Sequence, residues 1–164
     1  MPAGAPVAII GSMSAAIATM PAAACTAMAR SPRVTAGPAD AHVVGFAGRR
    51  LHVVDEDPDF PLSDPVRLTR EPERYALGQL LLVAVGDAGP AAALGAAELA
   101  DIDGIRRVDG TTPDYGCLAV PLRDASGAIA GGLAFSGPRH RILDAPDLVS
   151  RLTPVAERLA PYVT

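Results

Sequence analysis

The chain has 164 residues, 49% of them hydrophobic, and a formal net charge of −4 at pH 7. Its 14 basic residues are all arginine and are scattered in small groups, which argues against a nucleic-acid-binding protein because such proteins concentrate basic charge on one face. The length suits one domain with a substantial core plus an extension. Cys25 and Cys117 form no C-x-x-C pair, which fits a reducing cytoplasm.

The N-terminal segment carries no charged side chain from residue 1 to residue 29. It lacks the basic start of a secretory signal, and it is too rich in Ala, Ser, Thr and Gly for a membrane span. The sequence predicts a helix over residues 15–30 that kinks or begins at Pro21 and ends before Pro32. We therefore expect neither export nor membrane insertion.

Strand signals follow in two pairs. Residues 41–46 and 50–54 flank a short Gly-containing turn and predict a first hairpin. Residues 117–122 and 128–135 flank Asp124–Gly127 and predict a second one. Between the hairpins the sequence predicts a loop over 55–65, a short strand at 66–68, helices from about 71 or 73 to 85 and over 91–99, and a strand over 104–108.

A final helix is predicted from residue 145 or 146 to residue 159, with Asp144 as its cap and a stripe of Leu and Val on one side. Sequential hairpins interleaved with helices indicate an α+β architecture, in which an antiparallel sheet carries helices packed on it. We expect residues 1–36 to form an Ala-rich extension with a leading helix, and residues 37–164 to form the domain.

The second hairpin carries the most specific motif of the chain. It runs from Gly116–Cys117 through the D-x-x-G turn Asp124–Gly127 to Ser136–Gly137–Pro138 and Arg141–Ile142. This segment resembles the end of the effector-binding domain of IclR-family transcription regulators, whose fold is GAF-like. The helix start at residues 75–81, the first hairpin and Met20–Pro21 resemble further parts of that domain in the same order.

Two departures from the family pattern limit what the resemblance implies. The winged helix-turn-helix that precedes the effector domain in these regulators has no counterpart in the sequence, so we expect no direct DNA contact by this chain. In addition, Gln79 replaces a basic residue of the family, and Ala134 stands where the family's S-x-S strand has its first hydroxyl.

The resemblance also implies a small-molecule site between the sheet and the loops that cover it. Amide N–H groups at the start of a helix attract carboxylates, and small side chains on one face of the second hairpin leave room for a ligand. We expect two small-residue faces to oppose each other there. The implied ligand-binding residues are Ala76, Leu77, Gly78, Asp109, Cys117, Ala134 and Ser136.

Structural roles compete with these assignments. Cys117 can be a small core residue. A role as a nucleophile is less consistent with the sequence, since no Cys–His pair is evident. Ser136 and Asp109 can each simply close a turn. His42 and His52 are expected at the surface or half-buried on the first hairpin, close enough in sequence for the two to approach each other. Since no Cys–His, Ser–His–Asp or metal-ligand spacing occurs, the sequence predicts no catalytic residues, no metal and no cofactor.

The resemblance therefore implies an effector-binding domain that binds a small organic or aromatic acid and assembles as a homodimer or tetramer, and we expect it to be cytoplasmic and not an enzyme. The alternative is a stand-alone GAF-like module that acts through protein–protein contacts and has a degenerate pocket. A small thiol-dependent enzyme is a third possibility. Because Ala134 lacks the hydroxyl, we expect a ligand less polar than a two-carbon keto acid.

Overall fold

The structure is a computed structural model and describes residues 41–56, 65–108 and 115–164. In these residues the strands form one antiparallel sheet of five strands. The strands lie in the order β2-β1-β5-β4-β3, so the last strand in sequence, β5, occupies the centre. Both predicted hairpins are present, as the pairs β1–β2 and β4–β5. The strands are β1 (Ala41–Ala47), β2 (Arg50–Glu56), β3 (Ile105–Arg107), β4 (Tyr115–Arg123) and β5 (Ile129–Pro138).

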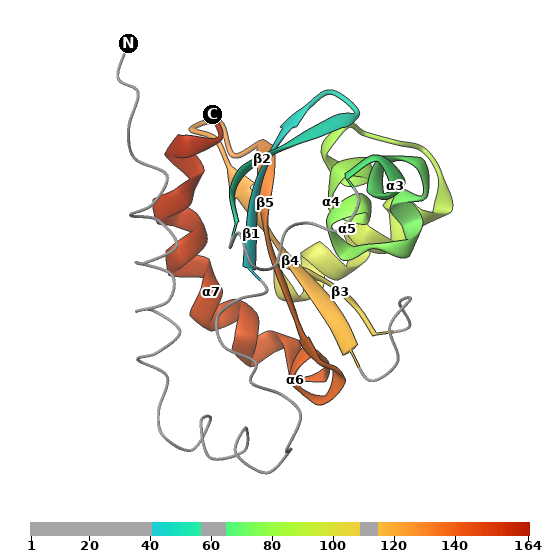
Figure 1. The fold of residues 1–164 in the computed structure, drawn as a ribbon, viewed down its shortest axis with the longest axis vertical. Helices are drawn as coiled ribbons and strands as arrows, with labels where there is room; N and C mark the ends of the chain where they lie inside the picture. Colours follow the sequence, from blue (N-terminus) through green and yellow to red (C-terminus); the bar gives the residue numbers. More distant parts are fainter. Residues whose placement is uncertain (1–40, 57–64, 109–114) are drawn as a thin grey trace.

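Helices cover both faces of the sheet (Figure 1). One face, which we call the α7 face, carries α6 and α7; the other, the α4 face, carries α3, α4 and α5. The predicted α+β, GAF-like architecture is thereby confirmed. The helices are α3 (Pro65–Arg70), the 3-10 turn η2 (Pro72–Arg74), α4 (Ala76–Ala84), α5 (Pro90–Ile102), α6 (Arg139–Leu143), α7 (Ala145–Leu159) and the 3-10 turn η3 (Ala160–Tyr162).

The central strand β5 supplies both hydrophobic cores because successive side chains of a strand point to opposite faces. Leu133 and Phe135 belong to the core under α7, whereas Ala134 belongs to the core under α4. At Gly132 an added Cβ atom would lie 2.7 Å from Leu77 Cδ1 and 2.9 Å from Leu80 Cδ2. The missing side chain of Gly132 is therefore what lets α4 approach the sheet so closely.

The turn of the second hairpin is fixed by one carboxylate. Asp124 Oδ1 accepts hydrogen bonds from the backbone N–H of Ser126 at 2.8 Å, from the Ser126 hydroxyl at 2.6 Å and from the N–H of Ala128 at 3.1 Å. These bonds hold the pKa of Asp124 below its ordinary value, the Ser126 hydroxyl contributing most. Gly127 completes the turn with a φ of 85°, a conformation that favours glycine.

Several details of the predicted elements are wrong. Residues 66–68 lie in the helix α3 and not in a strand. The predicted helix from residue 71 or 73 to 85 is interrupted at Tyr75, which is extended with φ −124° and ψ 142° and separates η2 from α4. The short helix α6, which lies between the second hairpin and α7, was not predicted. Asp144 does precede α7, but its side chain makes no capping hydrogen bond.

Candidate functional site

Small side chains gather on the α4 face where β4 and β5 pair. Residues that lie side by side across the strands form two neighbouring rows there. The inner row consists of Ile105, Ala119, Ala134 and His42, and the polar row consists of Arg107, Cys117 and Ser136. The inner row is buried, whereas the members of the polar row are only half-buried. The polar row thus lies at the margin of the core under α4.

The first turn of α4 packs against the inner row. Ala76 and Leu77 are buried in the same core as Ala119 and Ala134. Gly78 is buried as well, and a Cβ atom on it would collide with the backbone of Pro72 in η2. The first amides of a helix have no intrahelical acceptor, and here the first backbone bond into α4 is from Gln79 N–H to Tyr75 O, at 2.9 Å.

The structure therefore brings most of the predicted site residues together. Ala76, Leu77, Ala134 and Cys117 belong to or pack against one core, and Ser136 is the direct cross-strand partner of Cys117. Asp109 lies outside the described residues. The expectation of two opposed small-residue faces is wrong: because the two strands pair in register, their small residues lie side by side on the same face.

Two polar residues at this place were missed from the sequence as site residues. Arg107 continues the polar row beyond Cys117, and His42 continues the inner row beyond Ala134. The period-2 alternation from Ile105 to Arg107 was a usable signal for the first of them. His42 is only 7% exposed, so its predicted place at or near the surface is wrong. His52 is exposed on the opposite face, since its partner Gly45 is three residues from His42, and the two histidines do not approach each other.

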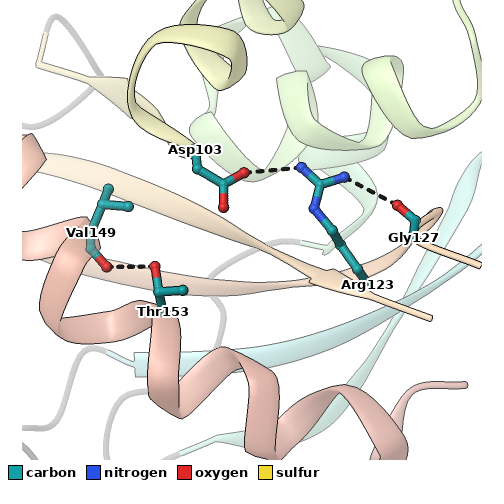
Figure 2. A network of polar contacts seen from close by, with 5 residues as sticks. All are labelled: Asp103, Arg123, Gly127, Val149 and Thr153. Carbon is teal, nitrogen blue, oxygen red and sulfur yellow. Dashed lines mark hydrogen bonds and ion pairs between the residues drawn. The ribbon is translucent and has the colours of Figure 1, made fainter. Parts of the chain in front are cut away.

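A cavity of about 200 Å³ lies between α7 and the second hairpin, away from the two rows described above. At its rim Arg123 donates hydrogen bonds to Asp103 at 3.0 Å and to the carbonyl of Gly127 at 3.2 Å (Figure 2). Thr153, whose hydroxyl bonds the carbonyl of Val149 at 2.8 Å, forms part of its α7 wall. None of its lining residues is among those predicted from the sequence.

The described residues were compared with the requirements of a metal site and of a membrane-spanning helix. Across residues 41–56, 65–108 and 115–164, no three His, Cys, Asp or Glu side chains are grouped so that they could hold a metal ion. No helix within those same ranges combines the length and the apolar character that crossing a membrane requires.

Comparisons by sequence find no relative. No protein-family model matches the chain, and no curated protein matches it significantly. Comparison of the fold, in contrast, finds similar solved structures. An IclR-family regulator from Rhodococcus aligns with a TM-score of 0.54 and 20% identity over 76% of this chain. This chain spans 58% of the length of that regulator.

Two further structures are similar. The repressor BlcR from Agobacterium tumefaciens aligns with a TM-score of 0.58 and 16% identity, over 91% of this chain and 69% of its own. The inducer-binding domain of a PobR double mutant from Acinetobacter, in complex with 3-hydroxybenzoic acid, aligns with a TM-score of 0.50 and 15% identity, over 73% and 86% of the two chains. The described part of this chain therefore has the fold of the effector-binding domain of IclR-family transcription regulators.

Proposed function

We propose that this chain is an effector-binding domain that senses a small organic or aromatic acid. The observation that carries the proposal is the placement of Cys117, Ser136 and the first turn of α4 on one face of the sheet, at the margin of a core lined by small residues. A binding site for a small ligand needs an apolar surface with a few converging polar groups, and this face offers both. The 3-hydroxybenzoic acid of the PobR complex is an acid of this class.

The proposed mechanism is linkage between ligand binding and subunit arrangement. A ligand that binds one arrangement of the subunits more tightly than another shifts the population toward it. Central strand β5 is suited to this role because its alternate residues contact the ligand side and the core under α7. Assembly as a homodimer or tetramer, a cytoplasmic location and a domain beginning near residue 37 are parts of the same proposal.

The second candidate is a GAF-like module that acts through protein contacts alone. Ala134 favours this alternative, because it offers no hydroxyl where the family has one and is only 8% exposed. Its neighbour Ala119 is completely buried, so the inner row by itself provides little polar surface for a ligand.

A thermal-shift screen against benzoate, 3-hydroxybenzoate, phenylacetate, pyruvate and glyoxylate distinguishes the two candidates. A ligand at about 100 times its Kd adds roughly 2.7 kcal/mol to the free energy of unfolding, and the melting temperature rises by several degrees. We expect an aromatic acid to produce this shift, and Cys117→Val and Ser136→Ala to reduce it. Ser150→Ala, on the exposed side of α7, is the matched control and should leave the shift unchanged. A well-folded protein that responds to none of the acids would favour the protein-contact module.

A further inference from the structure

We infer that Arg107 is the anion-binding residue of this site and selects carboxylic acids over their neutral analogues. The inference deepens the proposed function and rests on it. The family resemblance assigns no role to Arg107. The inference is drawn instead from the position of Arg107 in the sheet.

The strand register fixes where Arg107 lies. Ile105 and Arg107 are two residues apart on β3 and so point to the same face. Ile105 is completely buried in the core under α4, and Arg107 is the cross-strand partner of Cys117. Cys117 in turn is the partner of Ser136. A guanidinium, a thiol and a hydroxyl therefore follow one another across three adjacent strands.

Arg106, the residue before Arg107, has different partners. Arg106 contacts helices on both sides of the edge strand β3: its guanidinium donates to the carbonyl of Leu143 at the end of α6 at 3.3 Å. Its Nε also lies 3.3 Å from Glu98 Oε1. Arg106 is thus used to join elements of the fold, whereas Arg107 stands in the polar row next to Cys117.

The dimensions of the polar row suit a ring-sized acid. Adjacent strands are about 4.8 Å apart, so that β3 and β5 are separated by roughly 10 Å. A ligand with its carboxylate at Arg107 and its other end at Ser136 would lie across Cys117, which stands between them in the row.

The chemistry of the group favours a carboxylate. A guanidinium can donate two parallel N–H bonds to a carboxylate, and such charge-assisted pairs are about twice as strong as neutral ones. Arg107 already takes part in an interaction within the chain, and its five N–H donors can serve a ligand as well. The amides at the start of α4 are a weaker candidate, because Gly78 is covered by the backbone of Pro72.

Isothermal titration with three acids and their neutral primary amides tests the inference. The pairs are benzoate and benzamide, 3-hydroxybenzoate and 3-hydroxybenzamide, and phenylacetate and phenylacetamide. For the wild-type protein we expect the better-binding acid to have a Kd about tenfold or more below that of its amide. Arg107→Gln should weaken the acid until it binds about as tightly as the amide, while the amide itself is little affected.

Two variants complete the design. Arg106→Gln is the matched control, because it removes the same charge one residue away, and it should preserve the ratio of acid to amide. Arg107→Lys keeps the positive charge but not the two parallel N–H donors of the guanidinium, so we expect an intermediate ratio of the acid and amide affinities. If Arg107→Gln does not fold, Arg107→Lys tests the inference in its place.

The outcomes separate the inference from the proposed function. The role of Arg107 would be overturned if Arg107→Gln and Arg107→Lys both left the ratio of the amide Kd to the acid Kd unchanged. The effector site itself would still stand if Ser136→Ala weakened the binding of both acid and amide. The anion would then lie at the start of α4. Absence of saturable binding of any acid or amide by the wild-type protein would overturn both.

Discussion

Cys117 on β4 and Ser136 on β5 are direct cross-strand partners, and both lie half-buried on the α4 face of the sheet. Their side chains are neighbours, since facing residues of antiparallel strands have Cβ atoms about 4.5–5.5 Å apart. We therefore expect a ligand that contacts Ser136 to lie next to the sulfur of Cys117 as well.

This relationship predicts that the effector protects Cys117 from alkylation. In a Cys25→Ser background, which leaves Cys117 as the only thiol of the chain, iodoacetamide should modify Cys117 more slowly as the acid found by the thermal-shift screen saturates the site. Mass spectrometry of the modified protein measures the rate. The same rate with and without saturating ligand would place the ligand away from the polar row.

Restoring the missing hydroxyl should change ligand preference. Ala134→Ser adds a donor and acceptor next to Ala119 and His42 in the inner row. A new hydrogen bond contributes about 1 kcal/mol, so the affinity for glyoxylate or pyruvate relative to 3-hydroxybenzoate should rise by about fivefold. Titration calorimetry measures the ratio, and Ala125→Ser in the exposed turn is the control. Tighter binding of glyoxylate than of every aromatic acid by the unmodified protein would refute the predicted ligand class.

A side chain at position 132 should destabilise the domain. Gly132→Val would push its methyl groups into Leu77 and Leu80, which already lie within 2.9 Å of the Cβ position. Overpacking of this kind costs about 1–3 kcal/mol, and urea denaturation followed by circular dichroism measures the loss. Ala128→Val, at an exposed position just before β5, should change stability little. A Gly132→Val protein as stable as the wild type would mean that α4 does not rest on β5 at this glycine.

The Asp124 turn should stabilise the fold in a pH-dependent way. The pKa of Asp124 lies below its ordinary value of 3.8 because the Ser126 hydroxyl and neighbouring N–H groups bond the carboxylate. A carboxyl whose pKa is lower in the folded than in the unfolded state stabilises the protein above the unfolded pKa, and this contribution disappears as pH falls through the folded pKa. The melting temperature of Asp124→Ala should therefore fall below that of the wild type at neutral pH, and the difference should shrink below pH 3.8.

Ser126→Ala checks the cause of that shift. Removal of the hydroxyl that contributes most should raise the pKa of Asp124 toward its ordinary value, which an NMR titration of the carboxyl resonance detects. An unchanged pKa in this variant would mean that the backbone N–H groups alone hold the carboxylate.

Sequence reasoning succeeded where one local pattern determined the structure. The D-x-x-G turn and the alternation on either side of it were enough to predict the β4–β5 hairpin, although not that the small residues of the two strands lie side by side on one face. Sequence reasoning was less successful where tertiary packing overrides the local secondary-structure propensity of a segment. The Val66–Leu68 segment has the β-branched and apolar character of a strand, yet it forms part of α3, whose Leu68 is buried in the core under α4.

The candidate site was predicted only in part because sheet order is not a local property. The motifs identified Cys117 and Ser136, but Arg107 becomes their neighbour only once β3 pairs with β4 at the edge of the sheet. His42 joins the inner row for the same reason, since β1 pairs with β5 across a long stretch of sequence. Its burial follows from that pairing and not from the sequence around it.

The alternation along β5 has a consequence for how the protein can diverge. Gly132, Ala134 and Ser136 face one core, whereas Leu133 and Phe135 face the other. Under the proposed function, substitutions at positions 134 and 136 would alter ligand preference and leave Leu133 and Phe135, which pack in the core under α7, unchanged. Position 132 does not offer the same freedom, because a side chain there would meet Leu77 and Leu80 of α4.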